Sequence, residues 1–390
     1  MNTTVQKVYR NKNLQILFSV TLMSVMGVTI IAPVLPTIAK ELSLTEKSVG
    51  YLISVFTLPG IFLAPFLGIL SDRIGRKKVL IPSLFIFAIG GGICALSRDF
   101  TTLIIFRFIQ GVGAAPLAAV NLTIIGDLFK GKDRIEAMGI NASVLSVGTG
   151  LYPTIGGLVA IFGWYYPFAL SLLAIPVGLL VAFSLENPEP KSTEPMMTYL
   201  IKSFSLMKKF HILILFYSST ATFVLLYGIL IYYFPLFAEK KFTASPIAIG
   251  LIISLASFGT IIGSFNAGRF ARKLSSGKLI AIAYILYSIS LALIPLMPNI
   301  YTLVIPTFIY GFANGINIPN IQALISTAAP MEYRGAFMSI NAMVLRLGQT
   351  LGPVIAGAIF VAGGNFWLFT SGIILSLVSS IIIILTIGNK

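Results

Sequence analysis

Charged residues are scarce in this sequence. Asp, Glu, Lys and Arg together make up 10% of its 390 residues, whereas a soluble globular chain carries about 25%. Acidic residues are scarcer than basic ones. The sequence has 12 Asp and Glu and 27 Lys and Arg, which gives a formal net charge of +15. So few charges cannot cover a chain of this size with a water-facing surface, and the composition excludes an ordinary soluble protein.

Cysteine and histidine are nearly absent. Cys94 is the only cysteine, so no disulfide can form within the chain, and His211 is the only histidine, which leaves a metal site without partner ligands. The sequence also lacks a nucleophile–base arrangement and a phosphate-binding loop ahead of a Lys-Ser/Thr pair. We therefore predict no enzyme activity, no ATP-driven pumping, no cofactor and no metal.

Long apolar runs are what the chain has in abundance. A helix needs about 20 apolar residues to cross the hydrocarbon core of a bilayer, and backbone groups find no water there, so helices are the expected state. Breaks at charged or Gly/Pro-rich positions separate twelve such runs. They cover residues 14–39, 48–71, 78–96, 101–127, 136–162, 165–185, 210–238, 247–271, 278–297, 301–328, 336–362 and 365–387.

The basic residues stand in short clusters between the apolar runs. No basic face with interleaved aromatic residues exists, so we predict no nucleic-acid partner. The N-terminus, the even-numbered loops and the C-terminus hold 20 of the 27 Lys and Arg. Because positive charge stays inside, the pattern predicts a multi-pass protein of the cell membrane with both termini in the cytoplasm.

The chain repeats itself with a period of 200 residues. Met138/Met338, Asn141/Asn341, Gly148/Gly348, Pro153/Pro353, Gly157/Gly357 and Gly111/Gly311 are among the identical pairs. Such a repeat predicts two six-helix bundles in the same orientation, related by pseudo-symmetry. We expect an all-α integral membrane fold with twelve transmembrane helices, formed by bundles at residues 1–185 and 210–390. Residues 186–209 form a cytoplasmic linker that includes an amphipathic surface helix.

Three motifs in order resemble those of the major facilitator superfamily, and within it the twelve-span drug:proton antiporter group. The first is the loop motif between helices 2 and 3, found as Gly68, Asp72, Arg73, Gly75, Arg76 and Lys77. The second is "RFIQGVGAA", residues 107–115, in helix 4. The third, in helix 5, is found as Gly139, Gly148, Tyr152, Pro153, Gly156 and Gly157, with Tyr152 in place of a family glycine.

The resemblance implies roles for two of these motifs. The loop would act as a latch that stabilises the outward-open state through Asp72, and Arg76 would pair with an acid at the foot of helix 4, here Asp127. Gly75 allows a tight turn through positive φ. The glycines of the third motif would form a seam linked to antiport. Topology anchoring alone and simple helix packing remain the alternatives.

Two arginines, Arg107 and Arg346, fall inside apolar runs. A charge near the bilayer centre costs at least about 2.5–3.5 kcal/mol, so each is expected to face a cavity or a partner. Structural hydrogen bonding to backbone carbonyls is the alternative for Arg107. The candidate cavity residues, for which helix packing is the alternative, are Arg107, Gln110, Asn121, Arg346, Gln349, Tyr310, Asn314, Asn317, Tyr227 and Met26.

The expected function is secondary active transport by alternating access, as efflux of small amphipathic compounds in exchange for protons. The expected partners are a small-molecule substrate, protons and the lipid bilayer, and the protein is expected to be a monomer. No Asp or Glu lies in the middle of a run, so the arginines make the cavity electropositive. An exporter or exchanger of a specific organic anion or metabolite is therefore an open alternative. A non-transporting membrane sensor that has kept the fold is another.

Overall fold

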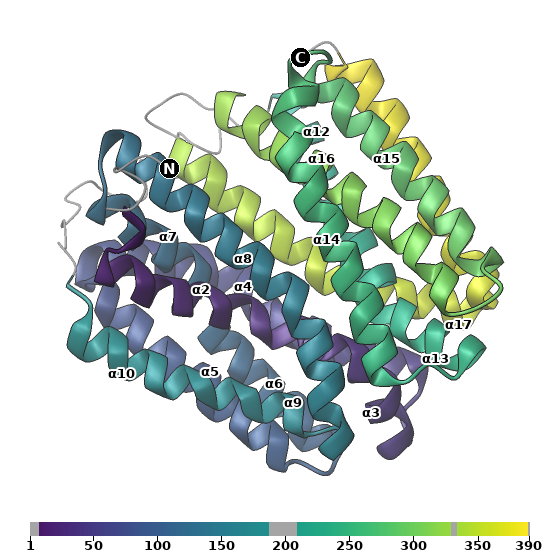
Figure 1. Ribbon diagram of the computed structural model, residues 1–390, viewed down its shortest axis with the longest axis horizontal. Helices are drawn as coiled ribbons and strands as arrows, with labels where there is room; N and C mark the ends of the chain where they lie inside the picture. The colour runs from purple at the N-terminus through teal and green to yellow at the C-terminus, as the bar shows by residue number, and fades with distance from the viewer. Residues whose placement is uncertain (1–7, 187–208, 329–333, 389–390) are drawn as a thin grey trace. The chain divides into compact units, whose positions relative to one another are not determined.

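A computed structural model describes residues 8–186, 209–328 and 334–388 of the chain. Within these ranges the regular structure is helical throughout (Figure 1). The surface helix expected in the linker lies outside the described residues. The helices of the first half are α2 (Lys12–Thr29), α3 (Leu35–Glu41), α4 (Glu46–Ile74), α5 (Arg76–Leu96), α6 (Phe100–Ala114), α7 (Leu117–Leu128), α8 (Gly131–Val159), α9 (Tyr166–Ala169) and α10 (Ala174–Ser184).

The second half begins with α12 (Phe210–Leu225), which continues through a π-helical stretch at Leu226–Tyr233 into α13 (Phe234–Phe242). It goes on with α14 (Pro246–Ala271), α15 (Ser276–Leu293), α16 (Val304–Ala328) and α17 (Arg334–Ile387). Within α17, Gly363 and Gly364 have non-helical backbone angles. This break lies between the last two apolar runs of the sequence.

Side-chain caps and turn residues set several helix ends. The carboxylate of Asp99 accepts a hydrogen bond of 2.8 Å from the backbone N–H of Thr102 at the start of α6. This bond lowers the pKa of Asp99. Gly75, between α4 and α5, has a φ of 107°, which confirms the positive φ expected for that turn.

The helices have the length and the surface of membrane spans. In the described part of the chain, ten helices are long and apolar enough to cross a bilayer. The 25-residue α16 is not among the ten, because its asparagines and prolines lower its hydropathy. Large apolar side chains are widely exposed, for example Phe183 at 85% and Leu385 at 78%. Surfaces of this kind belong in lipid.

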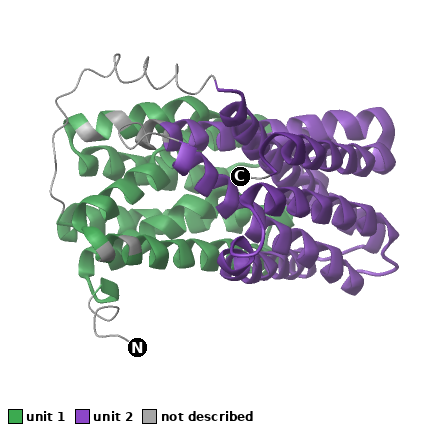
Figure 2. Cartoon of the chain, turned by 90° about the horizontal axis from the view of Figure 1, so that it is seen from above, with its two compact units in different colours: residues 1–34, 55–193 green, residues 35–54, 194–390 purple. Residues whose placement is uncertain are grey.

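The chain divides into two compact units (Figure 2). Unit 1 contains residues 1–34 and 55–193, and unit 2 contains residues 35–54 and 194–390. Unit 2 thus combines α3 and the first turns of α4 with the second half of the chain. Two ion pairs join these segments to α13, Lys40 with Glu239 and Lys240 with Glu46.

The period of 200 residues recurs in the helix packing. A Cβ added to Gly111 in unit 1 would collide with the carbonyl oxygen of Phe56, and one added to Gly311 in unit 2 would collide with that of Ala256. Phe56 and Ala256 are themselves 200 residues apart. The same close helix contact therefore forms in each unit, because only glycine lets the two backbones approach so closely.

Candidate functional site

Arg107 lies at the centre of a polar site in unit 1. It projects from α6 and is 0% exposed. Its guanidinium donates hydrogen bonds to the carbonyl of Gly27 in α2, at 2.9 Å, and to Oε1 of Gln110, at 2.7 Å. The ring centroid of Phe56 lies 4.2 Å from the guanidinium carbon. A carbonyl dipole, an amide and an aromatic face thus surround the charge.

Gln110 extends this polar site toward the next helices. Its amide donates to the hydroxyl of Ser171 at 2.7 Å, and the backbone of Gln110 packs against Gly90, where a Cβ would lie 2.7 Å from the Gln110 nitrogen. Gly91 lies beside Ser171 in the same way. Because Gly90 and Gly91 have no side chains, they leave space for the hydrogen-bonded series of Arg107, Gln110 and Ser171.

A second polar cluster in unit 1 joins α2, α7 and α8. The amide of Asn121 donates to the hydroxyl of Thr21 at 2.7 Å, and that hydroxyl donates to Oδ1 of Asn141 at 2.5 Å. All three residues are buried. Asn121, predicted as a cavity residue, therefore lies in a chain of helix-to-helix hydrogen bonds. Met26, also predicted, is buried in α2.

Arg346 is the arginine of unit 2 that falls inside an apolar run, and it is only partly buried. It donates to Oε1 of Gln349 at 3.0 Å, and its carbonyl accepts from the hydroxyl of Thr350. The carbonyl of Thr350 in turn accepts from Ser54 at 2.8 Å. Tyr227 stacks on Phe223, with centroids 6.0 Å apart and planes at 23°.

The π-helical stretch that holds Tyr227 was not predicted from the sequence. It brings Gly228 against Gly352 of α17, where a Cβ on Gly228 would lie 2.6 Å from the Gly352 carbonyl oxygen. In the first half, Tyr152 stands in the position of Gly352, so the sequence permits this approach in one unit alone. Short π-helical segments inside α-helices are often found at functional sites.

Phenol and amide groups form a buried network between α12, α15 and α16. Tyr287 donates to Oδ1 of Asn314 at 2.5 Å, and the amide of Asn317 donates to Thr222 at 2.8 Å. Tyr310, 4.7 Å from Tyr287 between ring centroids, is 0% exposed. The structure thus brings together the predicted Tyr310, Asn314 and Asn317, and these contacts are the kind that helix packing alone also requires.

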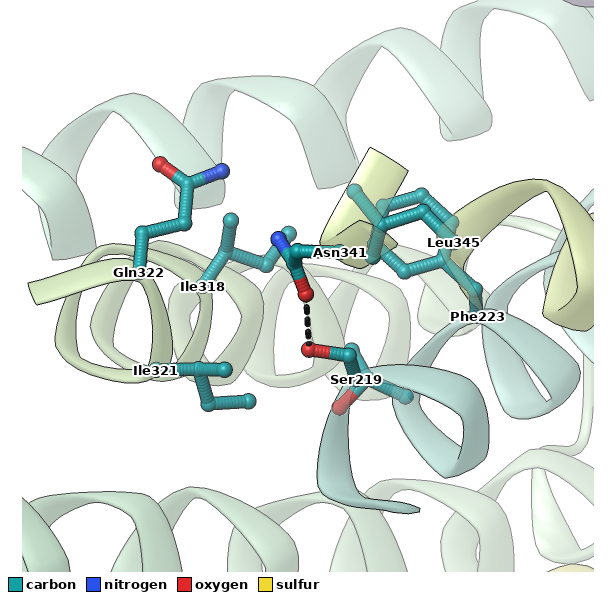
Figure 3. Close-up of a pocket in the computed structure, with 8 residues that line it drawn as sticks. Ser219, Phe223, Ile318, Ile321, Gln322, Asn341 and Leu345 are labelled. Atoms are coloured by element: carbon teal, nitrogen blue, oxygen red, sulfur yellow. Dashed lines mark hydrogen bonds between the residues drawn. The ribbon is translucent and has the colours of Figure 1, made fainter. Parts of the chain in front are cut away.

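A small pocket lies in unit 2 between α12, α16 and α17 (Figure 3). Its lining includes Ser219, Phe223, Ile318, Ile321, Gln322 and Asn341. Ser219, Ile318, Ile321, Gln322 and Asn341 were not predicted as cavity residues. The Asn141/Asn341 identity in the repeat was the one sequence signal that pointed to this place, and it gave no sign of the space beside Asn341.

The loop between α4 and α5 places one predicted pair together. Arg76 forms an ion pair with Asp127, with side chains 7% and 20% exposed, and it donates to the carbonyl of Thr123 at 3.3 Å. Lys77 instead donates to the carbonyls of Ala182 and Leu185 at the end of α10, at 3.0 and 2.8 Å.

Three other members of the loop motif lie apart from the Arg76–Asp127 pair. Arg73 is exposed, and a Cβ on Gly68 would meet nothing within 4 Å. The side chain of Asp72 lies outside the described residues, so its part in the latch stays a prediction.

The glycines of the third motif, which lie in α8, occupy both packed and open positions. A Cβ on Gly156 would collide with the carbonyl of Ile30, and one on Gly148 would lie 3.0 Å from Leu22 in α2. Pro153 and Gly157 are buried, as is Tyr152 at 8% exposure. Gly139, by contrast, has open space around it. The seam expected along this helix is therefore a contact with α2 and the residues that follow it.

Comparison with solved structures identifies the fold. A mutant of the nucleoside transporter NupG matches with a TM-score of 0.82 and 16% identity, over 97% of this chain and 100% of that chain. At this identity the likeness establishes the fold alone. The shared fold is a multi-pass arrangement of long apolar helices.

The family follows from the sequence comparisons. The family model described as "Major Facilitator Superfamily" matches residues 17–242 and 216–389, so the chain belongs to this superfamily. The bacillibactin exporter of Bacillus subtilis (strain 168) is 29% identical over 97% of both chains. Multidrug resistance protein 1 of the same organism is 30% identical over 92% of both. The resemblance drawn from the three motifs is thereby confirmed.

Proposed function

We propose that the protein exports small amphipathic compounds from the cell by alternating access and takes up protons in exchange. In this proposal twelve spans form two pseudo-symmetric bundles, residues 1–185 and 210–390, joined by the linker 186–209. Both termini lie in the cytoplasm, and the protein acts as a monomer. This proposal rests on the nearly full-length similarity to relatives named as a multidrug resistance protein and as an exporter.

The binding region in this proposal is the set of polar side chains held inside the two units. Arg107 and Gln110 contribute from unit 1, and Arg346 and Gln349 from unit 2. Burying an arginine inside a membrane costs free energy, so an arginine at such a position usually has a functional role. Tyr227, Tyr310, Asn121, Asn314, Asn317 and Met26 complete the proposed set.

Proton coupling needs a group that titrates. The arginines stay protonated at all relevant pH values, so they are unsuited to release a proton. In our proposal the proton passes through Asp127, an edge acid such as Glu41, or water. Asp127 is favoured because its ion pair with Arg76 is shielded from solvent.

Transport in proteoliposomes tests this function. With the purified protein and an imposed pH gradient, we expect saturable flux of neutral or weakly charged amphipathic dyes that exceeds the flux in protein-free liposomes by about tenfold or more. An ionophore that collapses the gradient should return the flux to the protein-free level. Compounds that bind without any gradient-driven movement would instead indicate a membrane sensor.

A specific organic anion is the second candidate substrate. The observation that favours it is the positive charge of Arg107 and Arg346 inside the apolar runs, which attracts anions in a low-dielectric cavity. Counterflow with labelled anions and labelled cationic dyes separates the two candidates. Saturable exchange of anions alone would contradict the multidrug function and leave the transporter assignment intact.

We further propose that the Arg76–Asp127 pair belongs to the conformational latch implied by the family motif. Asp127→Arg places two cations together in a shielded position, and loss of one partner from a buried pair costs about 3–5 kcal/mol. We therefore expect the flux to fall by at least about tenfold. The double variant Asp127→Arg, Arg76→Asp restores the attraction and should recover part of the flux.

The matched control is Arg73→Asp, since Arg73 is exposed in the same loop. It changes the loop charge as much as Arg76→Asp does but should leave the flux nearly unchanged. If the double variant is as inactive as Asp127→Arg alone, the pair does not act through its mutual attraction.

A further inference from the structure

The loop between α4 and α5 uses two of its cations within unit 1. Arg76 forms an ion pair with Asp127, and Lys77 donates to two carbonyls at the end of α10. At the same point of the repeat, 200 residues later, Ser276 and Gly277 replace Arg76 and Lys77. The loop between α14 and α15 in unit 2 therefore cannot form the same internal contacts.

This loop of unit 2 carries exposed cations instead. Four basic side chains lie in it or within a turn of it, and all four are exposed: Arg269, Arg272, Lys273 and Lys278. We call these four residues the cationic cluster. Arg272 stands in the position that Asp72 has in unit 1, so the repeat exchanges an acid for a base here.

The described acids of unit 2 lie far from the cationic cluster. They are Glu41, Glu46 and Glu239. Glu239 belongs to α13, just before the start of α14, and it pairs with Lys40, the neighbour of Glu41, while Glu46 pairs with a lysine of α13. The cluster begins at the other end of α14, whose 26 residues span roughly 39 Å at about 1.5 Å each. Since salt at about 0.1 M screens charges beyond about 10 Å, these acids cannot neutralise the cluster.

An exposed apolar face of α14 leads to the cationic cluster. Phe258, Ile261 and Phe265 are 54%, 40% and 75% exposed. Together with Arg269 and Arg272 they follow a spacing of three or four residues, which puts all five on one side of the helix. The order along this side, apolar residues and then arginines, matches the order of acyl chains and phosphate in a phospholipid.

Arg269 is held at the end of this apolar face by two contacts. Its guanidinium carbon lies 5.6 Å from the ring centroid of Phe265, and one N–H donates to Oδ1 of Asn266 at 3.2 Å. A guanidinium has five N–H donors, so further donors remain for an acceptor outside the protein. Guanidinium groups bind phosphate with paired N–H donors.

We propose that the cationic cluster and the apolar face of α14 bind an anionic phospholipid. Its phosphate accepts hydrogen bonds from Arg269 and Arg272, and the two lysines of the cluster add positive charge. Its acyl chains pack against Phe258, Ile261 and Phe265. Basic clusters beside membrane spans attract anionic headgroups. That this headgroup belongs to the cytoplasmic leaflet rests on the orientation proposed above.

Fluorescence quenching by brominated lipids tests the site. Cys94 is buried, so a Cys94→Ala, Ile261→Cys protein has one thiol, on the apolar face, for an apolar fluorophore. The full-length protein is reconstituted in phosphatidylcholine vesicles that contain either chain-brominated phosphatidylglycerol or chain-brominated phosphatidylcholine. Because basic residues near the membrane surface favour anionic lipid, we expect phosphatidylglycerol to associate at this position about threefold or more strongly than phosphatidylcholine.

Charge variants in the labelled protein assign this preference to the cationic cluster. Arg269→Gln combined with Arg272→Gln should bring the ratio of the two association constants close to one. Arg73→Gln combined with Lys78→Gln is the matched control, because it removes the same charge from exposed residues of the unit 1 loop, and it should keep the preference. Arg272→Asp, which gives the loop the acid of unit 1, should lower the preference more than Arg272→Gln does.

Two results would overturn the lipid site. Equal quenching by both lipids in the labelled protein without charge variants would mean that lipid phosphate does not occupy the cluster, and that another anion, such as an acid of the linker 186–209, does. An equal loss of preference in the two double variants would show a response to net charge alone.

The measurement needs no gradient, so it is independent of transport. Gradient-driven flux without a preference for phosphatidylglycerol would contradict the lipid site and leave the export function standing. A preference without flux would contradict the export function and leave the lipid site in place.

Discussion

Arg107→Ala is expected to reduce gradient-driven flux by about 100-fold or more. The substitution removes the hydrogen bonds to the Gly27 carbonyl and to Gln110, as well as the contact with the ring of Phe56. Hydrogen bonds to a charged group are worth about 1.5–3 kcal/mol each, and each 1.36 kcal/mol changes a rate about tenfold. Initial rates in proteoliposomes, normalised to the amount of folded protein, measure the effect.

Arg107→Lys and Arg98→Ala separate the possible causes of such a loss. Lysine keeps the charge but cannot hold both acceptors in one plane, so we expect Arg107→Lys to retain a small part of the flux. Arg98 bonds backbone carbonyls at the end of α5 and lies over the ring of Tyr165, outside the proposed binding set, and Arg98→Ala should stay active. Full activity of Arg107→Ala would make Arg107 a structural residue.

Gly311→Ala is expected to have the largest effect on folding. The new Cβ would collide with the carbonyl oxygen of Ala256 and force α14 away from α16. A backbone atom cannot move aside as the end of a side chain can, so the cost should reach the upper part of the usual 1–3 kcal/mol range for overpacking. We expect a clearly lower melting temperature in detergent and less protein in the membrane.

Gly268→Ala is the matched control for this substitution. Gly268 also lies in a helix of unit 2, but a Cβ there meets nothing within 4 Å. Alanine favours a helix over glycine by about 1 kcal/mol, so this variant should be as stable as the parent or more so. Equal melting temperatures for Gly311→Ala and Gly268→Ala would show that the helices tolerate the extra carbon atom.

Several features could be predicted from the sequence because they depend on local composition or on backbone preference. The long apolar helices follow from runs of apolar residues that have no water to bond in lipid. The turn at Gly75 follows from the tolerance of glycine for positive φ. The Arg76–Asp127 pair followed from the family motif, and the structure contains it. The family itself followed from three motifs in order.

Other features depended on the rotation and spacing of packed helices. The sequence marked Asn314 and Asn317 as polar residues on one face, but their bonds to Tyr287 and Thr222 were set by the neighbouring helices. The ion pairs of α3 and α4 with α13 join residues almost 200 positions apart. The π-helical stretch at Leu226–Tyr233 likewise has no signal in the apolar pattern.

The sequence by itself determined the family, the apolar helices and the repeat, since these depend on residue type and order along the chain. Only the tertiary structure decided that Asn341 accepts a hydrogen bond from Ser219 beside a small pocket, whereas Asn141 accepts one from Thr21 in a cluster with Asn121. The physical reason is that a void, or the hydrogen-bond partner of a buried side chain, depends on how several helices meet.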